Sequence, residues 1–384
     1  MVTIGGVVGR VRAPKGCTSL QKPKGATLLL IPLLLVALLK QLVWVAAIPP
    51  WQNPDEAAHY AYVDFLAVAR KLPDASQHTT LPPEESQSLI WSDQQQVSFH
   101  SNVQIDTTKR HALAYRKQLQ HPISFRFHGS TSATGYPPLY YVLNLPAYWL
   151  GGSNILLQLF FMRLTSAIFF LALVLLAYLI GSAADSRSLG LALAGLTAFQ
   201  PEVSMVFASV NNDVLVDVFG AGLFLLALRA PSLIPARTRA ATIGALLGLS
   251  LLSKAQAWPL VLIVLSLFAW HWRRHAQELA ILALSTVIVY LPWAIFALIH
   301  YGNPIGIMAG QLHGDFPSSL SAFLTAQLRR TPTYLGPQIW ADFGWLDTVF
   351  PSVVYRILQA LEPTFTTPTA SDGDYRLVAA TGII

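Results

Sequence analysis

Long apolar stretches constrain the fold of this chain more than any other feature of its sequence. The first, ATLLLIPLLLVALLKQLVWVAAI, covers residues 26–48 and can cross a bilayer as a helix, which takes roughly 20 residues. Further apolar stretches lie at residues 156–180, 189–208, 214–228, 241–252, 258–270 and 279–299. A soluble α-helical protein would not repeat stretches of this length. We therefore predict an all-α polytopic membrane protein with about seven transmembrane helices.

The composition excludes several other classes of protein. Charged residues make up 11% of the chain, whereas ordinary soluble domains contain about 25%. The lone cysteine, Cys17, excludes an internal disulfide framework and a Cys-based zinc site. The basic residues behind the net charge of +6 lie mostly between the apolar stretches, where they set orientation. We therefore expect no nucleic-acid partner.

The first apolar stretch has two interpretations. A basic segment precedes it and VAA stands near its end, as in a cleaved signal peptide. Its length exceeds that of a typical signal-peptide core, and more apolar stretches follow it. Both features favour an uncleaved membrane anchor.

Basic residues between the spans predict the orientation. With the N-terminus in the cytoplasm, three of the short connections between spans are also cytoplasmic. These connections carry Arg187, Arg229, Arg237, Arg239, Arg273 and Arg274. The connection SVNND, on the opposite side, has neither Lys nor Arg. A single broken helix over 241–270 would put Arg273 and Arg274 outside, so the positive-inside rule favours a helical hairpin there.

This orientation divides the chain into five regions. They are a cytoplasmic N-terminal segment (1–25), the first transmembrane helix (26–48), an outer loop subdomain (49–154), a transmembrane bundle (155–300) and an outer C-terminal segment (301–384). In a bacterium this is a multi-pass inner-membrane protein whose outer regions face the periplasm. The C-terminal segment ends in YRLVAATGII, which resembles the start of another span, so we expect it to be truncated.

The motif NPDEAAH follows the first span directly. Asn53 as a cap and Pro54 at the first helical position predict a helix start, and Asp55 and Glu56 in the first turn would favour the helix dipole. Asp55 and His59 are four residues apart and share a face, so the pair can also serve as a base or a metal site. The zinc-protease pattern H-E-x-x-H lacks its first histidine here. Structural and catalytic interpretations both stay open.

Charged residues near the outer ends of later spans predict a site on the same side of the membrane as the NPDEAAH motif. Glu202, Asp213 and Lys254 all fall there, and charges at membrane depth require a partner or a wet cavity. A lysine can neutralise a phosphate, which favours a phosphate-bearing substrate. Lys40, inside the first span, is explained equally well by snorkelling to the interface and by function.

Two aromatic segments are predicted to lie at the membrane surface. GYPPLYYVLNLPAYW, residues 135–149, predicts a short interfacial helix whose tyrosines form an aromatic belt. QIWADFGWLDTVFP, residues 338–351, contains Asp342 and Asp347 among aromatic residues. It predicts either a sugar-stacking wall or another interfacial helix.

Taken in order, several motifs resemble the GT-C superfamily of membrane glycosyltransferases. This superfamily includes protein O-mannosyltransferases and the lipid A aminoarabinose transferase. The motifs are NPDEAAHY, GYPPLYY, RLTSAIFFLALVLLAYLIG, FQPEVSMVFASVNNDV and LLSKAQAWPL, within residues 26–275. The combination is most similar to a bacterial membrane family of unknown function with a Pro-Asp-Glu-x-x-His motif and a Phe-Gly-Trp-Leu-Asp segment. The second of these matches residues 343–347.

The resemblance implies an inverting glycosyltransferase that moves a sugar from a polyprenyl-phosphate carrier to a glycan, lipid or protein acceptor in the cell envelope. It implies that Asp55 is the catalytic base and Glu56 a second acid that holds the geometry or binds metal. The implied substrate- or carrier-binding residues are His59, Tyr136, Glu202, Asp213 and Lys254, with Lys254 on the carrier phosphate. The resemblance leaves open whether the protein uses a cofactor. Asp55, Glu56 and His59 would hold a divalent cation, Mg²⁺ or Mn²⁺, only in a metal-dependent enzyme.

Two other functions stay open at this stage. A transporter or flippase for a lipid-linked sugar would use ionisable groups along a path through the bilayer. A non-catalytic assembly protein would keep the fold without the activity. The chain also departs from the superfamily, whose members commonly have more spans and a C-terminal outer domain.

Overall fold

The structure, a computed structural model, is built almost entirely from helices in the part of the chain that it describes. That part comprises residues 24–74, 85, 88–89, 133–228, 235–254, 257–269, 272–306, 342–343 and 348–349. The helices are α1 (Lys24–Ala47), α2 (Glu56–Ala69), α6 (Leu139–Leu150), α7 (Ile155–Ala184), α8 (Arg187–Phe199), α9 (Pro201–Val206), α10 (Asp213–Leu228), α11 (Ala236–Ser253), α12 (Trp258–Ala269) and α13 (Trp272–Tyr301). Two short antiparallel strands follow, β1 (Asp342–Phe343) and β2 (Thr348–Val349).

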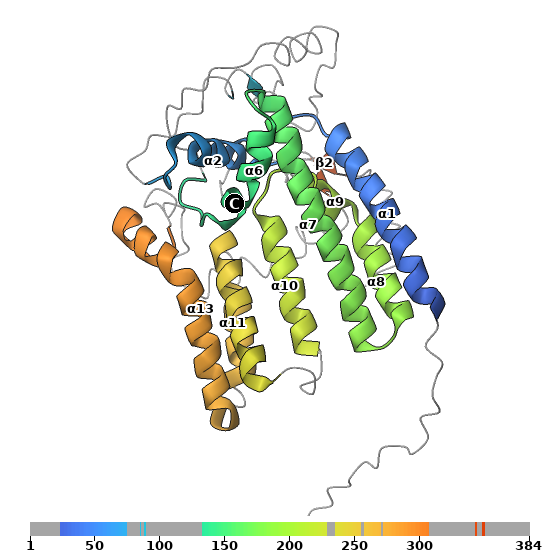
Figure 1. Cartoon of the computed structure of the whole chain (residues 1–384), viewed down its shortest axis with the longest axis vertical. Coiled ribbons are helices and arrows are strands. Elements are labelled where there is room, and N and C mark those ends of the chain that lie inside the picture. Colours follow the sequence, from blue (N-terminus) through green and yellow to red (C-terminus); the bar gives the residue numbers. More distant parts are fainter. Residues whose placement is uncertain are drawn as a thin grey trace, which may run out of the picture.

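The long helices run side by side as a bundle, with α2 and α6 at its upper end (Figure 1). Three helical segments of the described residues are long and apolar enough to cross a membrane: Leu28–Ala47, Ile155–Ala184 and Ala276–Tyr301. The outward side chains of α1 are large and apolar, as Leu28 and Leu39 illustrate. This is a membrane protein with several transmembrane helices. The count of seven stays a prediction, because α8 and α12 are shorter than a full span.

The predicted span at 189–208 is interrupted, and this part of the prediction is wrong. Helix α8 ends at Phe199 and α9 begins at Pro201, whose missing N–H suits a first helical position. The Gln200 side chain accepts a hydrogen bond from the Val203 N–H at 2.6 Å and caps α9. The apolar composition of the stretch concealed this break.

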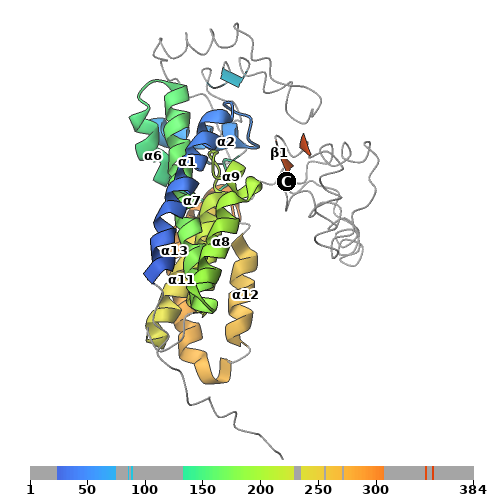
Figure 2. The same ribbon diagram turned by 90° about the vertical axis from the view of Figure 1, so that its right-hand side faces the viewer.

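The stretch at 241–270 forms two helices rather than one. Helix α11 ends at Ser253, Lys254 is extended, and α12 starts at Trp258. Figure 2 shows α12 lying alongside α11 and α13 rather than prolonging α11. The close packing of α11 on α13 requires a small residue at Gly244, where a Cβ atom would lie 2.3 Å from the Leu282 carbonyl oxygen. The predicted hairpin fits this arrangement.

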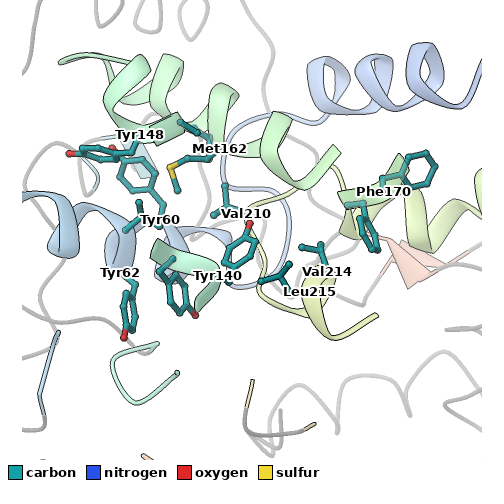
Figure 3. Packing of buried hydrophobic residues seen from close by; sticks show 14 of the residues in the cluster. Tyr60, Tyr62, Tyr140, Tyr148, Met162, Phe170, Val210, Val214 and Leu215 are labelled. Atoms are coloured by element: carbon teal, nitrogen blue, oxygen red, sulfur yellow. The ribbon is translucent and has the colours of Figure 1, made fainter. Parts of the chain in front are cut away.

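An aromatic core fixes α2 and α6 to the upper end of the bundle (Figure 3). Trp51 meets Tyr60 edge to face at 5.2 Å, and Tyr62 stacks on Tyr141 at 3.8 Å between ring centroids. Tyr140 and Tyr141 are fully buried, and Tyr148 is almost so. The tyrosines of 135–149 on α6 therefore face inward, and the predicted aromatic belt is wrong for them. Burying these large rings against α2 lowers the free energy more than leaving them at an interface.

Candidate functional site

Two ion pairs lie at the upper end of the bundle, and the first is buried. Arg163 of α7 forms a two-pronged contact with Glu56, the first residue of α2. Its Nε donates to Glu56 Oε1 at 2.8 Å and its Nη2 donates to Oε2 at 2.6 Å. The Glu56 and Arg163 side chains are 0% and 4% exposed. We call this pair the clamp.

The clamp ties three segments together. Arg163 also donates to the carbonyl oxygens of Val45 and Ile48, at the end of α1, where helical carbonyls lack partners. Glu56 accepts two further hydrogen bonds, from the backbone N–H groups of Trp51 and Val210 at 3.1 Å each. The Glu56 carboxylate is therefore fully engaged inside the protein. Its predicted role as a second acid of the site stays a prediction.

The start of α2 differs from its prediction. Asp55, not Asn53, precedes the helix, and the Asp55 side chain makes no capping hydrogen bond. Asn53 is buried, so its predicted role as the cap is wrong. The backbone of Asp55 is left-handed, with φ 59° and ψ 0°, and Trp51 is left-handed as well. Such strain at a non-glycine residue persists only where the surroundings impose it, and here the clamp fixes the turn.

The second ion pair is partly exposed and lies beside Asp55. Lys254 Nζ contacts Asp213 Oδ1 at 2.6 Å, and the two side chains are 18% and 42% exposed. Lys254 directly follows α11 and Asp213 begins α10. Asn212 Nδ2 joins the same two helix ends by donating to the Ser253 carbonyl at 2.9 Å. Partial desolvation raises the pKa of Asp55, the charge of Lys254 lowers it, and Asp213 raises it. The structure thus brings together three of the predicted site residues.

His59 and Tyr136 adjoin this charged group. The His59 ring stacks with Tyr136 and with Tyr141, at 5.9 and 5.8 Å between ring centroids, and its Nδ1 shares a 2.8 Å hydrogen bond with the Tyr141 hydroxyl. Burial and the charge of Lys254 lower the pKa of His59 to about 3, so its imidazole is neutral at physiological pH. Desolvation, Asp55 and Asp213 raise the pKa of the half-buried Tyr136.

Glu202 lies elsewhere. It belongs to the first turn of α9, which packs on α8 and α1 on the other side of α7 from α2 (Figure 1). Nearby, the ammonium of Lys40 donates to the Ala198 carbonyl and the Ser204 hydroxyl, and it lies 4.8 Å from the Phe170 ring centroid. Lys40 therefore joins α1 to α8 and α9, which neither snorkelling nor a substrate path had predicted.

The three residues named for a divalent cation do not converge. Glu56 faces Arg163, His59 bonds Tyr141, and Asp55 is exposed at the turn. Among the described residues, no group of three or more His, Cys, Asp or Glu side chains can hold a metal ion.

Sequence reasoning assigned no role to Arg163 or Tyr141. A signal for Arg163 was present, because an arginine within the first turns of an apolar helix requires an internal acid. Tyr141 carried no such signal, since its role depends on the packing of α6 against α2.

Comparison with known proteins identifies a family. Residues 38–361, which include the clamp and the Lys254–Asp213 pair, match the family described as "Predicted membrane protein (DUF2142)". The chain belongs to this family. No curated protein and no solved structure matches the chain. The expected membrane family of unknown function is thereby confirmed, and the relation to GT-C enzymes stays a prediction.

Proposed function

We propose that the protein is an inverting membrane glycosyltransferase. It moves a sugar from a polyprenyl-phosphate carrier to a cell-envelope acceptor on the outer face of the bacterial inner membrane. The observation that supports this proposal is the partly exposed Lys254–Asp213 pair next to an exposed Asp55 whose side chain is not used for capping. We call these three residues the charged site.

The charged site contains a base and a cation suited to this reaction. Asp55 accepts the proton of the acceptor hydroxyl, and its raised pKa makes it a stronger base than an ordinary carboxylate. The acceptor oxygen bonds to the anomeric carbon while the bond from that carbon to the phosphate oxygen breaks. Polyprenyl phosphate leaves with the bonding electrons, and Lys254 stabilises its added negative charge. Attack opposite the leaving group inverts the anomeric centre.

Asp213 acts as the counter-ion of Lys254 before substrate binds. Its contact with Lys254 is a single short one, and its side chain is 42% exposed. The phosphodiester of the carrier bears one negative charge, like the carboxylate, and it replaces Asp213 at the ammonium; the second charge then develops on the leaving phosphate beside Lys254. The released Asp213 then remains near Asp55 and keeps the pKa of that carboxyl raised.

The clamp supports the site without touching substrate. Glu56 accepts four hydrogen bonds, two of them from Arg163, and these hold the turn in which Asp55 is left-handed. A flippase has less support than before, because Lys40, the charge deepest in the first span, is bonded to α8 and α9.

The test uses the protein in vesicles with polyprenyl-phosphate-linked sugars and an envelope extract as the source of acceptors. The readout is release of free polyprenyl phosphate together with labelling of an acceptor. Asp55→Asn is the informative variant, because asparagine also tolerates the left-handed conformation. Asp185→Asn, at an exposed position at the end of α7, is the matched control.

Loss of both readouts in Asp55→Asn, with Asp185→Asn unchanged, supports the proposal. Normal transfer by Asp55→Asn would overturn the assignment of the base. Movement of the labelled carrier across the bilayer without release of polyprenyl phosphate would favour a flippase instead.

A further inference from the structure

Helix α6 presents an apolar face away from the protein. Val142, Leu143, Trp149 and Leu150 are 45%, 42%, 60% and 72% exposed, and their spacing puts them on one side of the helix. The opposite side, which includes Tyr141 and Asn144, is buried against the bundle. The sequence of α6 contains no Asp, Glu, Lys or Arg. In water, this face would be an exposed patch of large apolar side chains that no charged residue of α6 borders.

The transmembrane helix that follows also exposes large apolar side chains. Leu157 and Phe160, in the first turns of α7, are 43% and 39% exposed. Helix α7 has 30 residues and is therefore about 45 Å long, whereas the hydrocarbon core of a bilayer is about 30 Å thick. Helix α6, about 18 Å long, lies beside its upper part (Figures 1 and 2).

Three backbone N–H groups of the turn between α6 and α7 are paired within the protein. The N–H groups of Gly151, Gly152 and Asn154 donate to carbonyl groups within α6 and the turn. Gln158 Nε2 donates to the Gly152 carbonyl at 2.7 Å, and the Asn154 side chain accepts from the first N–H groups of α7. Backbone at membrane depth has to be paired in this way, because lipid offers no hydrogen bonds.

We propose that α6 is a half-membrane helix whose apolar face is inserted among the lipid acyl chains of the leaflet next to the charged site. Lipid fits this surface better than a protein partner, because the surface is uncharged and the helix that follows it, α7, is long and apolar enough to cross a membrane and also exposes large apolar side chains. Since Tyr141 on the inner side of α6 bonds His59, this insertion sets the charged site at the boundary between acyl chains and head groups. The inference does not depend on whether the protein transfers a sugar.

Spin labels on single cysteines test the insertion. In a Cys17→Ser background, the full chain carries a nitroxide at Leu150→Cys or at Leu143→Cys, and is reconstituted in phosphatidylethanolamine–phosphatidylglycerol vesicles. Collisions with oxygen, which concentrates in acyl chains, are compared with collisions with a water-soluble nickel chelate. Ile168→Cys, 66% exposed in the middle of α7, is the lipid control, and Lys71→Cys, exposed after α2, is the aqueous control.

The expected result is strong relaxation by oxygen and loss of access for nickel at both α6 positions, as at Ile168. Access for nickel equal to that at Lys71 would overturn the proposal, because the face would then lie in water. Labels that neither reagent reaches would also overturn it, in favour of a protein partner. Both substitutions are at exposed positions, so the variants are expected to fold.

Discussion

The two ion pairs at the upper end of the bundle have the same shortest contact distance but different surroundings. Glu56 and Arg163 approach to 2.6 Å, as do Asp213 and Lys254. The first pair is buried, two-pronged and surrounded by further hydrogen bonds, whereas the second is a single contact that solvent reaches. Burial and a full set of hydrogen bonds, rather than the presence of opposite charges, therefore separate a structural pair from one that can exchange a partner.

Breaking the clamp is expected to have the largest effect on stability. Arg163→Met leaves Glu56 buried without its cation, which costs about 3–5 kcal/mol. Arg237→Met, at an exposed arginine that donates to Gln277, is the control and is expected to change little. Thermal unfolding in detergent measures both variants. Equal melting temperatures for the two would show that the clamp is not structural.

Breaking the other pair is expected to affect transfer far more than folding. Lys254→Gln removes a contact that solvent screens, so the loss of stability is at most about 1 kcal/mol. Transfer is expected to fall sharply, because the phosphate loses its cation, and Asp55→Asn is expected to lower transfer about 10²- to 10⁴-fold. Lys71→Gln on the same side is the control. Transfer by Lys254→Gln at the rate of this control would contradict the proposed phosphate contact.

His59, which lies close to Lys254, provides a test in acid. Its pKa is about 3 in the folded protein and returns to about 6.5 on unfolding, so the unfolded chain binds the additional proton between these values. Stability is therefore full above pH 6.5 and is lost as the pH falls towards 3. Between pH 6.5 and 5 this amounts to roughly 2 kcal/mol. Melting temperatures should fall less for His59→Asn than for the wild type, and parallel curves would contradict a buried neutral imidazole.

The smallest expected effect is a shift in the pH profile of transfer. Only ionised Asp55 can accept a proton, so the rate should rise with pH through its pKa. Because Asp213 raises this pKa and Lys254 lowers it, Asp213→Asn should move the rise to lower pH. Lys254→Gln should move the rise of its residual activity to higher pH than in the wild type. Profiles that do not move in opposite directions would show that the two charges do not act on Asp55.

The sequence predicted the helices well where the pattern was local. The positions of α1, α7 and α13 follow from apolar length alone. Asp213 and Lys254 were expected on the side of Asp55, because the basic residues in the connections set the orientation of the spans. The predictions from sequence were wrong where residues far apart in the chain determine the local structure. Asn53 was predicted to cap α2, but Arg163, 107 residues after Glu56, determines how the turn forms.

Asp55 and Glu56 show where the sequence alone stops and the tertiary structure decides. By itself, the sequence determined that a pair of acids follows a membrane helix, because apolar length and charge placement are properties of the chain. The sequence alone could not show which of the two acids is buried in an ion pair and which is exposed. The fold buries Glu56 on the guanidinium of Arg163 and leaves the Asp55 carboxylate exposed beside Lys254 and Asp213. The difference is decided by the dielectric surroundings and hydrogen-bond partners of each carboxylate, which only the folded chain supplies.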